Sequence, residues 1–185
     1  KVPDAAFAMS DHFNWDGSSV VVDDKTGRRA GAYAAYNDTA KDFHSVASYT
    51  RHSLNWLSHN WPGIPYPYEK STVVQGYAGM EYPMISFNGY RPTPDEKSGK
   101  ITYSRNTKYG LIGVIIHEVG HNYFPMIVNN DERQWMWMDE GLNTFLQYLA
   151  ELERVLADAA AAQQKAFDVP TLCGHPSGRR GGVPR

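Results

Sequence analysis

One stretch of this chain would be apolar around almost the whole circumference of a helix, yet it carries two histidines and a glutamate. Residues 108–124 distribute Leu, Ile and Val over all sides with no proline between them, which predicts a buried helix. Asn106 or Thr107 is expected to cap its start, and Pro125 to end it. Imidazole and carboxylate groups in a buried helix are costly unless they bind a ligand or are paired.

The three polar residues form the pentapeptide HEVGH, whose spacing suits a metal ion. His117 and His121 are four residues apart, so both project from one helix face about one turn apart. Glu118 lies roughly 100° around the axis from His117, where it can reach a water on the metal without binding the metal itself. Chance supplies such a pentapeptide in roughly one chain of this composition in a hundred. The alternative is a pair of hydrogen-bonded core histidines.

A third ligand is expected from the start of the next helix, predicted over residues 138–162. Glu140 follows His121 with 18 residues between them, and a chain that reverses can bring this carboxylate back to the imidazoles. Three protein ligands, an open position for water and a nearby base are what a zinc hydrolase needs. We therefore predict one Zn²⁺ per chain. The alternative for Glu140 is an acidic residue favoured in a first helical turn by the helix dipole.

The pattern HExxHxxGxxH, in which a third histidine at a fixed position completes the zinc site, is excluded. That pattern requires Gly at position 124 and His at position 127, where this chain has Phe124 and Ile127.

HEVGH, the gap of 18 residues and the following WMDEG resemble the aminopeptidase N family of gluzincin zinc metallopeptidases. The segment GMEYP at 79–83 resembles the GxMEN strand of that family, in the form found in bacterial-type members with Tyr after the Glu. The resemblance implies that Glu81 binds the free α-amine of a peptide, and that Gly79 and Met80 belong to the strand that pairs with the substrate. Taken alone, Glu81 could be a solvated residue at a strand end.

The resemblance covers roughly residues 3–151 and implies an α+β fold. The expected fold is a thermolysin-like zincin catalytic domain, with a small mixed β-sheet packed on helices and the HExxH helix beneath an edge strand. Residues 1–10 would end a preceding β domain, 11–166 would form a catalytic domain incomplete at its C-terminal side, and 167–185 would be a disordered tail.

The activity implied by the resemblance is that of a zinc metallo-aminopeptidase. His117, His121 and Glu140 would hold the zinc, Glu118 would act as the catalytic base, and peptides with a free N-terminus would be the substrates. In the family, the oxyanion-stabilising Tyr lies well after the third ligand, and Tyr148 is too close to Glu140 to take that position. No residue of this chain is assigned to the role, so an isolated fragment of this kind need not be active.

Two other function classes stay open beside the aminopeptidase. One is a non-catalytic interaction module that keeps the zincin fold, although the chain retains all four residues of the metal and base set. The other is an endopeptidase that uses the same metal site.

Elsewhere the sequence indicates alternating short strands and one further helix. The expected elements are a hairpin within residues 1–34, an amphipathic helix over 36–61, strands at 71–77 and 81–87, and a possible strand at 101–104.

Charge and composition limit the kinds of partner that the sequence predicts. A net charge of −2 gives no reason to expect nucleic acid or an anionic membrane. No apolar run is long enough to cross a membrane, and the single cysteine, Cys173, excludes a disulfide within the chain. The compartment is not indicated.

Overall fold

The computed structural model describes residues 2–89, 94–101 and 103–167, without the side chains of Lys41 and 158–167. The chain divides into two units, Lys1–Glu153 and Arg154–Arg185, and the sheet and first two helices belong to the first. The tail predicted over 167–185 lies, after Phe167, outside the described residues. The boundaries predicted at residues 10 and 166 stay predictions.

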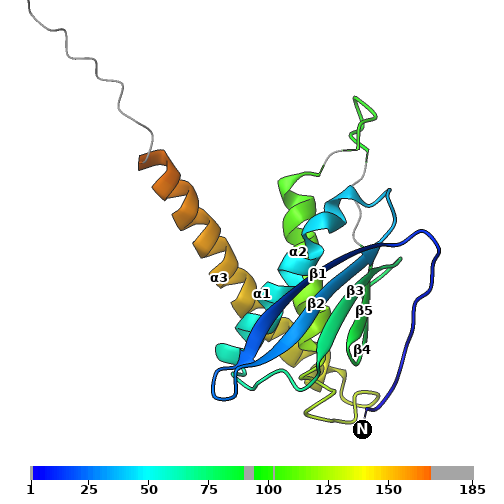
Figure 1. The fold of residues 1–185 in the computed structure, drawn as a ribbon, viewed down its shortest axis with the longest axis vertical. Helices are drawn as coiled ribbons and strands as arrows, with labels where there is room; N and C mark the ends of the chain where they lie inside the picture. Colours follow the sequence, from blue (N-terminus) through cyan, green and yellow to red (C-terminus); the bar gives the residue numbers. More distant parts are fainter. Residues whose placement is uncertain (1, 90–93, 102, 168–185) are drawn as a thin grey trace, which may run out of the picture. The chain divides into compact units, whose positions relative to one another are not determined.

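A five-stranded mixed sheet is the centre of the described part of the first unit, in agreement with the expected small mixed sheet (Figure 1). Its order is β1-β2-β3-β5-β4, with β1 antiparallel to β2, β3 parallel to both of its neighbours, and β4 antiparallel to β5. The strands are β1 (Asn14–Asp23), β2 (Arg28–Tyr36), β3 (Lys70–Gln75), β4 (Met80–Tyr82) and β5 (Ile85–Asn88).

Two strand predictions need correction. The expected strand over 81–87 is instead a hairpin, because the chain turns back between β4 and β5 at Pro83 and Met84. The possible strand at 101–104 is reduced to an isolated bridge between Ile101 and Pro94 among the described residues. As a result β4 is a short edge strand, and it carries Glu81.

The helices begin and end at other residues than predicted. Helix α1 (Val46–His59) follows a short 3₁₀ turn, because the first residues of the expected 36–61 helix end strand β2 and lead away from it. Helix α2 (Arg105–Gly120) is capped by Ser104, whose hydroxyl accepts from the backbone N–H of Thr107 at 3.1 Å, and not by Asn106 or Thr107. Helix α3 (Glu140–Phe167) begins two residues later than expected.

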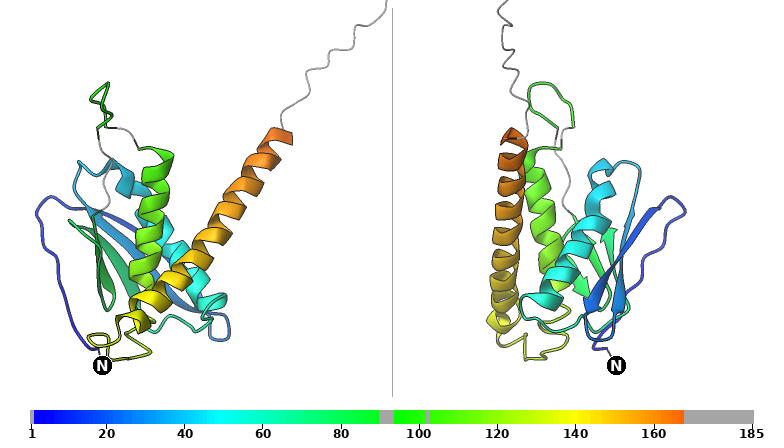
Figure 2. Two further views of the ribbon diagram at one scale, coloured as in Figure 1. Left: turned by 180° about the vertical axis from the view of Figure 1, so that it is seen from behind. Right: turned by 60° about the vertical axis from the view of Figure 1, so that its left-hand side comes forward.

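Helices α1 and α2 lie on one face of the sheet (Figures 1 and 2). The hydrophobic core is formed where these two helices pack against the sheet and against each other. Small side chains on β2, including Ala32 and Ala34, are fully buried and let α1 approach the sheet closely. From α2, Leu111, Ile115 and Val119 are fully buried, in agreement with the predicted buried helix. Each such side chain contributes about 1.5–3 kcal/mol through burial. This packing holds the carboxyl end of α2 close to the β4 edge.

Within the described residues, none of the helices has the length and apolar character needed to cross a membrane.

Candidate metal centre

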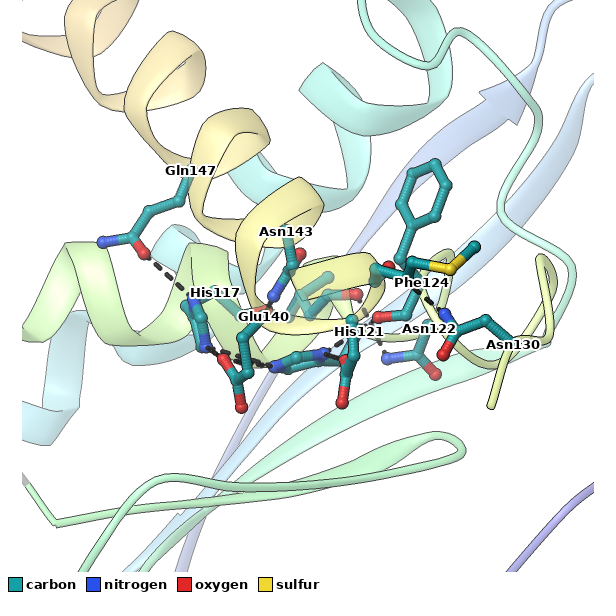
Figure 3. Close-up of polar contacts among 11 residues, drawn as sticks. His117, His121, Asn122, Phe124, Asn130, Glu140, Asn143 and Gln147 are labelled. Carbon is teal, nitrogen blue, oxygen red and sulfur yellow. Dashed lines mark hydrogen bonds and ion pairs between the residues drawn. The ribbon is translucent and has the colours of Figure 1, made fainter. Parts of the chain in front are cut away.

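Helices α2 and α3 approach each other closely at two glycines of α2, Gly120 in its last turn and Gly113 in its middle. An added Cβ at Gly120 would overlap the side chain of Asn143, and one at Gly113 would overlap the carboxylate of Glu151. Asn143 uses this close approach to donate from Nδ2 to the backbone carbonyl of His117 at 2.8 Å (Figure 3). The first turn of α3 is thereby fixed against the last turn of α2.

This contact brings together the three residues predicted as metal ligands, His117, His121 and Glu140, which form the metal group (Figure 3). His117 Nε2 lies 3.1 Å from Glu140 Oε2 and 3.1 Å from His121 Nε2, and the third side of the triangle, His121 Nε2 to Glu140 Oε2, is 3.7 Å. Tetrahedral zinc with bonds of about 2.0–2.2 Å requires ligand atoms about 3.3–3.6 Å apart. The three sides of the triangle, 3.1, 3.1 and 3.7 Å, lie within about 0.2 Å of this range, so small side-chain shifts would fit such an ion.

The hydrogen bonds of the two histidine Nδ1 atoms determine whether the Nε2 atoms carry a hydrogen or a free lone pair. The Gln147 amide donates from Nε2 to Glu151 Oε1 at 2.7 Å, so its Oε1 accepts from His117 Nδ1 at 3.0 Å. His121 Nδ1 donates to the Phe124 carbonyl at 2.8 Å. Both neutral rings thus carry their hydrogen on Nδ1 and leave a lone pair on Nε2.

Three electron-rich atoms therefore face one point, two imidazole Nε2 atoms and a carboxylate oxygen. Such an arrangement is repulsive unless a cation lies between them. Burial, followed by the neighbouring His121, lowers the pKa of His117, which favours the neutral imidazole that a metal requires. The donor set of two nitrogens and one carboxylate suits Zn²⁺. The Glu140 side chain is 52% exposed, so the group opens to solvent on that side.

Asp139 is a member of the site that the sequence reasoning missed. Its buried Oδ1 lies 2.8 Å from His121 Nδ1. The hydrogen on His121 Nδ1 is nevertheless donated to the Phe124 carbonyl. Burial is the main cause that raises the pKa of Asp139 to about 6, and the carboxylates of Glu140 and Glu81 add to it. Its position directly before Glu140 was the available signal.

Gln147 and Asn143 were also missed, although their spacing contains a signal. Gln147 follows Glu140 by seven residues, which is two helical turns, so both point toward the same side of α3.

Glu118 is buried between α2 and the segment that leads into β4. Only 5% of the residue is exposed, and its Oε2 has no hydrogen-bond partner among the residues that the structure describes. An added Cβ at Gly79 would overlap Glu118 Oε1, so the glycine leaves room for this carboxylate. Burial, followed by the charges of Glu81 and Glu140, raises the pKa of Glu118 to about 8. This carboxylate binds a proton readily.

Glu81 lies on the edge strand beside the metal group. It pairs with Ser86 of β5, and one of its oxygens lies within 4.8 Å of donor atoms of both His121 and Asp139. A cavity of about 390 Å³ adjoins it, lined in part by Met80 and by the segment after α2. Gly79 directly precedes the strand. The structure thus brings Gly79, Met80 and Glu81 to the neighbourhood of the metal group, while their roles toward a substrate stay predictions.

No family model matches this chain, and no curated protein matches it. Among solved structures, the chain is similar to an M1 zinc metallopeptidase from Deinococcus radiodurans, with 16% identity and a TM-score of 0.49. The match covers 86% of this chain and 33% of the other, so the chain spans about a third of the length of that protein.

Proposed function

We propose that this chain carries the catalytic site of a zinc metallopeptidase, and that the enzyme is an aminopeptidase with a thermolysin-like zincin fold. The observation that carries the proposal is the convergence of His117 Nε2, His121 Nε2 and Glu140 Oε2 within 3.7 Å, with the buried Glu118 carboxylate next to them. A purely structural cluster would have a donor hydrogen among these atoms.

Zinc bound by this group supplies a Lewis acid that polarises a peptide carbonyl and makes a water molecule more acidic. Glu118 accepts the proton of the attacking water as the new C–O bond forms. Glu118 then donates this proton to the nitrogen of the leaving amine as the C–N bond breaks, so water is added across the peptide bond. In the metal-free chain burial raises the pKa of Glu118 to about 8, which suits the second step, because the group can hold the proton before it donates it to the amine.

Recognition of the substrate's N-terminus is assigned to β4. As the edge strand, β4 can pair with an extended peptide through its backbone, with Gly79 and Met80 beside the peptide. The Glu81 carboxylate then accepts charge-assisted hydrogen bonds from the α-ammonium. An N-terminus held by Glu81 would place the first peptide bond of the substrate beside the metal group, as an aminopeptidase requires.

Two other functions would use the same fold differently. An endopeptidase would share the metal group and Glu118 but would not depend on a charged N-terminus. An interaction module would not need a buried carboxylate beside three converging lone pairs, so the retained Glu118 favours catalysis.

The deciding experiment combines metal analysis of the purified chain with cleavage of matched peptide amides, unblocked or acetylated. We expect one zinc per chain and cleavage of unblocked substrates only. Equal cleavage of both would indicate an endopeptidase. Zinc without cleavage of either is expected of the interaction module and equally of a fragment that lacks the oxyanion-stabilising Tyr, and a chain without zinc would contradict the whole proposal.

A further inference from the structure

The turn that reverses the chain between β4 and β5 has an unusual backbone. Met84 has φ of 69°, and it is the single non-glycine residue with positive φ in the described part of the chain. An unbranched but bulky side chain is disfavoured in this left-handed region, where Gly or Asn is preferred. Pro83 precedes it and fixes its own φ, as expected for the second residue of a tight turn. Something outside the turn must therefore stabilise Met84.

The side chain of Asn122 supplies this contact. Asn122 is 2% exposed, and its Oδ1 accepts from the backbone N–H of Met84 at 3.2 Å. Its Nδ2 donates to the Val119 carbonyl at 3.2 Å, which anchors the amide to the last turn of α2. The Met84 carbonyl in turn accepts from the Thr72 N–H of β3 at 2.9 Å. Met84 is thus held from both sides.

Asn122 directly follows His121, and Met84 follows Glu81 by three residues (Figure 3 shows Asn122 beside His121). One amide therefore connects the turn that carries a metal ligand with the hairpin that carries the proposed ammonium-binding carboxylate. We propose that Asn122 is a positioning residue that holds Met84 in the left-handed conformation and thereby sets the place of Glu81 against the metal group. Its expected effect on substrates rests on the proposed function; its effect on the hairpin does not.

An amide suits this position better than similar side chains. Asn122→Asp would bring a second oxygen against the Val119 carbonyl, and an aliphatic side chain would leave the Met84 N–H without its acceptor. Tyr66 offers a matched control, since its hydroxyl lies 3.3 Å from the same Asn122 Oδ1 and 3.1 Å from the Lys70 carbonyl. Tyr66→Phe removes a neighbour of Asn122 without touching Met84.

The experiment compares Asn122→Ala, Met84→Gly, the double variant and Tyr66→Phe with the unchanged chain. Three quantities are measured: hydrogen exchange of the backbone over residues 80–88, zinc content, and KM for unblocked and acetylated amino-acid amides. Asn122→Ala should speed exchange in the hairpin about tenfold or more and raise KM for unblocked substrates severalfold, with zinc retained. Tyr66→Phe should change hairpin exchange and KM much less than Asn122→Ala does.

Glycine adopts positive φ without strain, so the loss caused by Asn122→Ala should be at least about threefold smaller when residue 84 is glycine. Equal losses in both backgrounds, or unchanged exchange over 80–88 in Asn122→Ala, would overturn the proposal.

If Asn122→Ala does not fold, Met84→Val decides, because a β-branched residue resists positive φ without disturbing Asn122. Met84→Val should speed hydrogen exchange over residues 80–88. Exchange as slow as in the unchanged chain would overturn the proposal. A chain that does not distinguish unblocked from acetylated substrates contradicts the aminopeptidase function, while the exchange measurements still decide the role of Asn122.

Discussion

The Nε2 atoms of His117 and His121 lie 3.1 Å apart, although neither carries the hydrogen that could join them. The hydrogens are on the opposite sides of the rings, where Gln147 and the Phe124 carbonyl accept them. This relationship distinguishes a metal-binding pair from two histidines that satisfy each other in a core, and the predictions below depend on it.

Removal of one imidazole should abolish zinc binding. His121→Ala leaves only His117 and Glu140, too few ligands for a stable tetrahedral site, so the zinc content should fall from one per chain to near zero. Elemental analysis after dialysis against a weak chelator measures this. The exposed His12 provides the matched control, and His12→Ala should keep its zinc. Full zinc in His121→Ala would show that the ligands are assigned wrongly.

Replacement of the proposed base should separate catalysis from metal binding. Glu118→Gln keeps the size of the side chain but cannot accept the water proton, so kcat should fall about 10²–10⁴-fold. Zinc content should stay at one per chain, since Glu118 is not one of the three converging ligands. Loss of zinc together with activity would mean that Glu118 binds the metal.

The α-ammonium assignment is tested by Glu81→Ala. This variant should raise KM and lower kcat/KM for unblocked amino-acid amides at least about tenfold, because a charge-assisted hydrogen bond is lost. Acetylated substrates lack the ammonium and should lose little further. Glu96→Ala, in an exposed loop, is the control. Equal losses on both substrate types would show that Glu81 does not recognise the amine.

The absence of a side chain at residue 79 should matter for Glu118. Gly79→Ala adds a Cβ that overlaps Glu118 Oε1, so the carboxylate must move, and kcat should fall about tenfold or more with zinc retained. At Gly141 an added Cβ makes only an ordinary contact with Trp137, so Gly141→Ala should be nearly neutral. A fully active Gly79→Ala variant would indicate that Glu118 adapts freely.

The metal-free chain should lose stability as pH rises. Burial raises the pKa of Glu118 from 4.5 to about 8 in the folded chain, so the folded state holds this proton more tightly than the unfolded state does. Its contribution is therefore fully present below pH 4.5 and is lost as pH rises to about 8, by an amount on the order of a few kcal/mol. Urea unfolding of the metal-free chain and of Glu118→Gln at about pH 5 and about pH 9 should show a clearly larger decline with glutamate at 118, while the raised pKa of Asp139 adds a smaller decline to both proteins. The same decline in both proteins would mean that another group causes it.

Local patterns determined the elements that depend on neighbours in sequence. The buried character of α2 follows from apolar residues on all its sides, and the pairing of His117 with His121 follows from the helical repeat. The early β1–β2 hairpin was also predictable, because alternation of side chains and turn residues are properties of a short segment. The approach of Glu140 to the two imidazoles was also predictable, because it requires only that the chain reverses direction between two consecutive helices.

Only the tertiary structure decided what depends on contacts between distant segments. The run around Glu81 has the composition of one strand, and it becomes a hairpin in which Asn122, from the turn after α2, stabilises Met84 with positive φ. Gly79 makes room for Glu118, which is 39 residues away in sequence, and Gln147 holds the Nδ1 hydrogen of His117 across 30 residues. Such contacts form between side chains of separate elements, whose approach is set by the packing of the whole core, so no periodicity in the sequence reports them.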